Sequence, residues 1–148
     1  MMRRVETGEH YAGEVPLELF RQGAFEEKRY LDKAVEIVQR GIEALKVTRA
    51  EPIRVCSGYI LSKVREELEA GGFKITRVRI TGPTQELAER EYIRSLVRLG
   101  VGGEREVAGM RGFDSFLLWV QEDLERRERF VKTGWPSWPR LKREGGPR

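Results

Sequence analysis

The stretch that decides the fold is 53–80, which reads IRVCSGYILSKVREELEAGGFKITRVRI. Its two ends, 53–56 and 73–80, are rich in β-branched residues and alternate apolar with polar positions, which predicts two short strands. Between them, apolar residues recur at helical spacing over 59–70, and a glycine pair supplies the stop. A strand–helix–strand unit of this length predicts that the two strands are parallel neighbours.

Helical patterns lie on both sides of this unit. Apolar residues recur at helical spacing over 25–46, with glutamate and arginine between them. A third helix is expected to begin at Pro83, where the missing N–H of proline is harmless, and to end at Gly100. Residues 100–112 are rich in glycine and predict a connector of low order before a fourth helix over 114–130. This order predicts an α/β fold, a two-layer arrangement of a small parallel sheet with flanking helices.

The chain has 148 residues, a length that suits one domain with one core. Residues 1–24 show no sustained period and predict an irregular arm. Residues 25–131 form the expected single α/β domain. Residues 132–148 carry Trp-Pro-Ser-Trp-Pro and a basic end, which predicts an extended tail. Because two parallel strands are few for a stable domain, we expect the arm or a second chain to add strands.

Composition favours a cytoplasmic protein with no membrane partner. Charged residues make up 35% of the chain, and the mean hydropathy is −0.54. The longest apolar run, 116–120, is far too short to span a bilayer. The basic first residues are not followed by an apolar signal core. The single cysteine, Cys56, allows no intramolecular disulfide, as is usual in a reducing compartment.

The charged residues are used unevenly. There are 21 Arg against 7 Lys, 21 Glu against 3 Asp, and no Asn. Abundant ion-pairing residues with few thermolabile amides are typical of thermophile proteins, so we expect a thermophilic source. One histidine, one cysteine and three scattered aspartates predict no metal site. Neither strand turn matches a nucleotide-binding loop, and no cofactor is expected.

The first candidate site lies at the carboxyl ends of the predicted strands. In a parallel unit both strands end at the same edge, where ligands of open α/β sheets bind. Two helix N-termini with free N–H groups at that edge suit a phosphate or a carboxylate. The alternative is that the same residues only cap helices and form tight turns. The candidate ligand-binding residues are Ser57, Gly58, Thr81, Gly82, Thr84 and Gln85.

Arginines alternate with apolar residues in both predicted strands. In the second strand, period two places Arg77 and Arg79 on one face and Val78 and Ile80 on the other. In the first strand, Arg54 points away from its apolar neighbours. If all helices pack on the apolar face, the three arginines line the open face, where planar guanidinium groups suit phosphate recognition. The alternative is a set of solvated arginines paired with glutamate.

The tail combines tryptophans with basic side chains. Such a segment can stack its rings on bases while its charges meet phosphates. The alternative is that the tryptophans dock on their own domain or on a partner subunit. The candidate nucleic-acid-binding residues of the tail are Trp135, Trp138, Arg140, Lys142 and Arg143.

The fourth predicted helix carries five adjacent apolar residues, 116–120, which surround the helix on all sides. One core-facing stripe cannot hide them all, and Leu118 and Trp119 are left over. We expect an interface there, most simply a two-fold homodimer. The alternative is that the N-terminal arm covers both side chains.

These patterns favour a non-catalytic binding protein for nucleic acid or another phosphate-bearing ligand. The net charge of +4, the strand arginines and the tail support this hypothesis. A small enzyme with its active site at the strand ends is the alternative, with Ser57, Thr81, Gln85 and Glu89 as its polar groups. An oligomeric structural or assembly subunit is a third hypothesis.

Overall fold

The computed structural model describes residues 1–110 and 112–144, and the chain divides into two compact units. The first unit combines 1–15 with 28–90, and the second combines 16–27 with the chain from Glu91 onward. The division into an arm (1–24), an α/β domain (25–131) and a tail (132–148) stays a prediction. The fold is α/β as predicted, with a small parallel sheet and flanking helices.

The first unit is built on the predicted strand–helix–strand stretch. Strands β3 (Ile53–Cys56) and β4 (Ile75–Val78) are parallel neighbours, which confirms the prediction. Ile53 pairs with Ile75 at one end of the ladder and Cys56 pairs with Val78 at the other. The short 3-10 helix η2 (Tyr59–Leu61) and helix α2 (Ser62–Ala70) connect the strands. Gly72 has φ +80°, so it supplies the left-handed stop expected after this helix.

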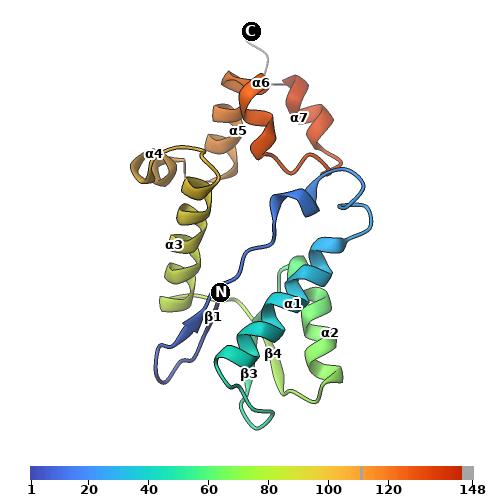
Figure 1. Cartoon of the computed structure of the whole chain (residues 1–148), viewed down its shortest axis with the longest axis vertical. Coiled ribbons are helices and arrows are strands. Elements are labelled where there is room, and N and C mark those ends of the chain that lie inside the picture. Colours follow the sequence, from blue (N-terminus) through green and yellow to red (C-terminus); the bar gives the residue numbers. More distant parts are fainter. Residues whose placement is uncertain (111, 145–148) are drawn as a thin grey trace. The chain divides into compact units, whose positions relative to one another are not determined.

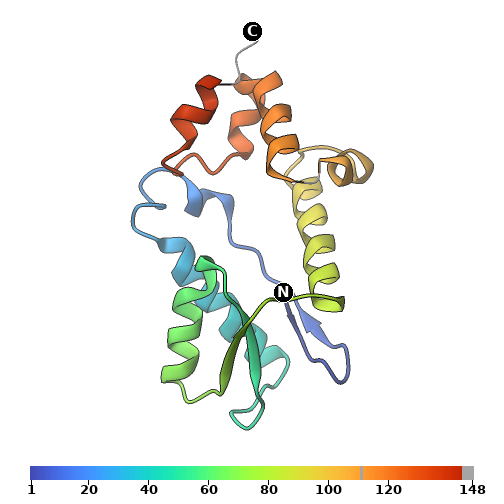
Figure 2. The same ribbon diagram turned by 180° about the vertical axis from the view of Figure 1, so that it is seen from behind.

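Helices α1 (Arg29–Ala44) and α2 cover one face of the sheet. Figure 1 shows both helices in front of β3 and β4, and Figure 2 shows the strands from the opposite side. The core of this layer pair consists of small and branched side chains that fit between a helix and a pleated sheet. Its buried members are Ala34, Val55, Val64 and Leu68.

The N-terminal residues form a hairpin of their own. β1 (Met2–Arg3) pairs antiparallel with β2 (His10–Tyr11), and neither strand joins β3 or β4. The arm therefore forms strands of its own but does not extend the parallel sheet. The other alternative, a second chain that adds strands, stays a prediction. The hairpin packs instead on α1 at Gly41, where a Cβ would meet the side chains of Met2 and Tyr11. Gly41 thus marks a close contact, as its place inside a helical pattern suggests.

The second unit is helical in its described part. Helix α3 (Pro83–Arg98) begins at proline as predicted, and the boundary between the units falls within it. The expected connector after Gly100 contains the short helix α4 (Glu104–Gly109), which is a correction. Its cap is a hydrogen bond from the Gly103 N–H to the Glu106 carboxylate, at 2.9 Å. A 3-10 helix, η1 (Leu17–Phe20), also belongs to this unit.

The predicted fourth helix is broken at Asp123. Its parts are α5 (Phe113–Glu122), α6 (Leu124–Arg127) and the 3-10 helix η3 (Glu128–Phe130). Asp123 has φ −150° and ψ 71°, outside the helical region, and its carboxylate accepts a hydrogen bond from the Arg126 N–H. An aspartate that caps the following turn interrupts the helix at this position.

A second hydrophobic cluster supports these helices. Leu96, Val101 and Val107 are buried at its centre. Rings and other apolar side chains pack around them, namely Ile93, Met110, Phe116, Trp119 and Phe130.

Helix α7 (Trp138–Glu144) lies within 132–148, the stretch that was expected to be extended, and corrects that expectation for 138–144. Residues 145–148 of the tail lie outside the described residues. Pro139 is the second residue of α7. Proline is tolerated in the first turn of a helix because the N–H groups there have no partner within the helix. Pro139 is therefore compatible with the first turn of a helix. Across 1–110 and 112–144, no helix is both long enough and apolar enough to cross a membrane.

Candidate anion-binding pocket

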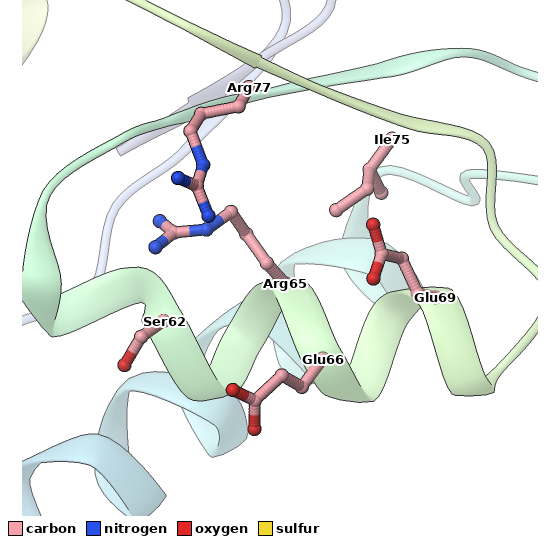
Figure 3. A pocket seen from close by; sticks show the side chains of 6 residues that line it. All are labelled: Ser62, Arg65, Glu66, Glu69, Ile75 and Arg77. Carbon is pink, nitrogen blue, oxygen red and sulfur yellow. The ribbon is translucent and has the colours of Figure 1, made fainter.

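A small pocket of about 160 Å³ lies between α2 and β4 in the first unit. Figure 3 shows how its side chains lie. The side chains of Arg65 and Arg77 extend toward each other, the Glu69 carboxylate lies beside Ile75, and Ser62 and Glu66 point away from the sheet. The lining residues are Ser62, Arg65, Glu66, Glu69, Ile75 and Arg77.

Arg65 is a buried charge at the end of β3, with only 7% of its surface exposed. Its Nη1 donates hydrogen bonds to the carbonyl oxygens of Cys56, at 2.7 Å, and Gly58, at 3.1 Å. A strand that ends inside a folded unit leaves carbonyl groups without ladder partners, and each needs a donor. Arg65 supplies that donor, so its position is fixed by the backbone that it closes.

Arg77 reaches the same pocket from β4. The register pairs Arg77 with Val55, a core residue, so its side chain leaves the sheet on the face that α1 and α2 cover. It is nevertheless exposed. Figure 3 places its guanidinium beside that of Arg65. Within the described chain, neither arginine has an ion pair with a carboxylate.

Two adjacent guanidinium groups without a carboxylate form a local excess of positive charge. Like charges at close range repel, and the repulsion grows as water is excluded from one of them. An anion with several oxygens removes that repulsion and accepts hydrogen bonds from both planar groups. The arrangement can therefore bind a phosphate or a carboxylate.

The predicted basic face is not formed by all three strand arginines. Arg54 pairs with Thr76, so its side chain leaves the sheet on the face opposite to that of Arg77. Arg54 is exposed on the open face, and Arg79 lies beyond the last residue of β4. The alternation within each strand is as expected. The offset between the strands is what separates the arginines.

The predicted strand-end site stays a prediction, and the structure places its residues as follows. Helix α2 begins at Ser62, and η2 lies between it and Ser57. Gly58 precedes η2 and makes no side-chain cap hydrogen bond. Gln85 donates a hydrogen bond to Glu89 along α3, at 3.0 Å. Among the described residues, no hydrogen bond joins the first turn to the second. The residues concerned are Ser57 and Gly58 on one side and Thr81, Gly82, Thr84 and Gln85 on the other.

The tail residues have different environments. Trp138 is 5% exposed, and its Nε1 donates a hydrogen bond to the Glu128 carboxylate at 2.8 Å. Lys142 donates to the same carboxylate. The hydrogen bond from Lys142 has the largest effect on the pKa of Glu128 and lowers it, and the hydrogen bond from Trp138 lowers it further. Trp138 therefore packs within its own unit and offers no ring to a base. Trp135 is 41% exposed and meets the ring of Phe113 edge-on, while Arg140 and Arg143 are exposed.

The two predicted interface residues also differ. Leu118 is 63% exposed. Trp119 is half-buried: its ring stacks on Phe116, and the guanidinium of Arg127 lies over it at 4.4 Å. The apolar surplus on α5 is therefore confined to Leu118 and to Phe113 at the start of the helix.

Sequence reasoning missed Arg65 and Glu69. A signal for Arg65 existed, because it follows Leu61 by four positions and precedes Leu68 by three. That spacing puts a charged residue in an apolar stripe, which indicates a buried polar group with a structural or functional role.

Over 1–110 and 112–144, no group of three or more potential metal ligands occurs. No protein-family model, curated protein or solved structure matches this chain significantly.

Proposed function

We propose that this chain is a non-catalytic binding protein for a small phosphate-bearing ligand, held in the pocket between α2 and β4. The observation that carries the proposal is the pair of guanidinium groups of Arg65 and Arg77, which line one pocket without a carboxylate partner. Arginine suits this task because its planar fork binds two oxygens of one phosphate.

The two arginines contribute differently. Arg65 is held in place by the two carbonyls that it closes, so its remaining N–H groups are oriented before a ligand arrives. Such preorganisation lowers the entropy lost on binding. Arg77 is exposed, so its guanidinium is accessible from solvent. The pocket therefore combines a donor that the backbone holds in place with an exposed donor.

A pocket of about 160 Å³ suits a small ligand better than a polymer. Nucleic acid, the other partner expected from the sequence, calls for several cations along one surface. Arg54 and Arg77 point to opposite faces, and Trp138 is buried, so these residues support the small ligand. The cytoplasm stays the proposed compartment.

The decisive experiment compares Arg77→Gln with Arg54→Gln. Both variants remove one exposed strand arginine and change the net charge equally, so non-specific attraction is matched. Titration calorimetry with inorganic phosphate and ethyl phosphate at fixed salt gives the affinities. We expect Arg77→Gln to weaken binding by roughly tenfold or more, and Arg54→Gln to leave it within about twofold. Equal losses in the two variants, or no binding to the unaltered chain at millimolar phosphate, would refute the proposal.

Nucleic acid is tested in the same way. If a nucleic acid were the partner, both variants would lose affinity for it alike, and binding would fall steeply with salt.

A homodimer remains our proposal for α5, supported by the exposed Leu118. Leu118→Ser should then shift sedimentation from dimer to monomer. A monomeric unaltered chain at micromolar concentration would contradict this.

A further inference from the structure

The pocket has a negative end as well as a positive one. Glu69 follows Arg65 by four positions and lines the same pocket. In Figure 3 its carboxylate lies beside Ile75, on the side away from the two guanidinium groups. Among the described residues, the Glu69 carboxylate has no hydrogen bond or ion pair. The pocket therefore holds a carboxylate that can bind a cation and, apart from it, two guanidinium groups that can bind an anion.

This separation is informative because an ion pair was within reach in the sequence. Residues four positions apart on a helix are neighbours, and glutamate and arginine at that spacing commonly pair. Here Arg65 turns instead to the carbonyls of Cys56 and Gly58, which leaves Glu69 without its obvious partner. The side chain of Ile75 adds an apolar surface to the lining.

Resting on the proposed function, we infer that the ligand is a small zwitterion of the aminoalkyl phosphate class. Its phosphate binds Arg65 and Arg77, its carbon chain contacts Ile75, and its ammonium group binds Glu69. An ammonium group also explains how an anionic ligand is accepted beside a carboxylate, because the positive charge cancels the repulsion from Glu69. A phosphate without an ammonium group would still bind the two arginines, but nothing in it would offset the repulsion from Glu69.

The test compares phosphoethanolamine with ethyl phosphate, which has the same chain length and no ammonium group. Calorimetric titrations at fixed salt use the full chain, Glu69→Gln and the matched control Glu67→Gln. Glu67 is exposed on α2 and is not a lining residue. We expect the unaltered chain to prefer phosphoethanolamine by roughly tenfold, the effect of one charge-assisted hydrogen bond.

Glu69→Gln should abolish that preference while it keeps, or slightly improves, the binding of ethyl phosphate. Glu67→Gln should retain the preference. Equal affinities for the two compounds in the unaltered chain would overturn the zwitterion inference and leave the proposed function standing, provided that Arg77→Gln still weakens both. Binding of neither compound would overturn both proposals. A preference that survives in Glu69→Gln would overturn the assignment of the ammonium group to Glu69.

Discussion

Arg65 joins the end of β3 to α2 through a hydrogen bond from its Nη1 to the carbonyl oxygen of Cys56, at 2.7 Å. The donor and the acceptor lie nine positions apart in the chain. A second bond from the same nitrogen, to Gly58, closes the turn that follows the strand. The candidate ligand group is therefore also a structural group of the first unit, and the two roles have to be separated experimentally.

Replacing Arg65 by methionine should destabilise the protein. The substitution leaves the carbonyls of Cys56 and Gly58 without their donor. Because both bonds are only partly buried, we expect a loss of about 0.5–1.5 kcal/mol for each hydrogen bond. Arg65→Lys keeps the charge but lacks the planar fork, so it should recover only part of the loss. Urea unfolding measures both variants. An unchanged midpoint for Arg65→Met would contradict the closing role of this side chain.

Replacing Arg77 and Arg79 together by alanine should leave the fold nearly intact. Both side chains are exposed, and substitutions at such positions change the unfolding free energy by less than about 0.5 kcal/mol. The same urea experiment measures the double variant beside the unaltered chain. A loss above about 1 kcal/mol would mean that one of these arginines supports the structure, and binding data on that variant would have to be corrected for unfolding.

Gly134→Ala should destabilise the second unit. A Cβ at this position would lie 2.5 Å from the Phe25 Cβ and 2.9 Å from the Arg21 backbone, which cannot move as a side chain can. Overpacking of this kind costs about 1–3 kcal/mol. Gly109→Ala is the control, because its Cβ meets nothing within 4 Å and the residue ends α4. Equal thermal unfolding midpoints for the two variants would rule out the close contact.

The contacts of Glu128 predict a loss of stability in acid. Hydrogen bonds from Lys142 and Trp138 lower the pKa of its carboxyl group. A carboxyl group whose pKa is lower in the folded protein than in the unfolded chain stabilises the fold at pH values above the unfolded-state pKa. This stabilisation is lost as the pH falls through the folded-state pKa. The effect should stay below about 1 kcal/mol, because the carboxylate is partly exposed. Unfolding midpoints between neutral pH and acid should therefore fall less steeply for Glu128→Gln than for the unaltered chain.

The sequence predicted those parts of the fold that local patterns determine. The strands, their parallel pairing, the glycine stop at Gly72 and the start of α3 at Pro83 all follow from period, turn chemistry and proline geometry. The break at Asp123 and the helix that begins at Trp138 were missed, because a capping aspartate or a proline can either start or stop a helix. Packing decides between these outcomes.

The candidate site could not be predicted because it depends on the offset between two strands. Alternation says which residues of one strand share a face, but it does not say which residue of the other strand lies beside them. Here Arg54 lies beside Thr76, so the expected trio of arginines is divided. Arg77 instead meets Arg65 from α2, a pairing across twelve positions that no period in the sequence indicates.

The interleaved make-up of the two units bears on how the chain folds as it is synthesised. Residues 16–27 belong with the chain from Glu91 onward, so they leave the ribosome well before the helices that complete their unit exist. Until then the side chain of Phe20, which is only 7% exposed in the folded protein, stays in contact with water. Long-range closure of this kind slows folding and keeps apolar surface in contact with water. A newborn chain of this protein should therefore depend on holdase chaperones until its last helices emerge.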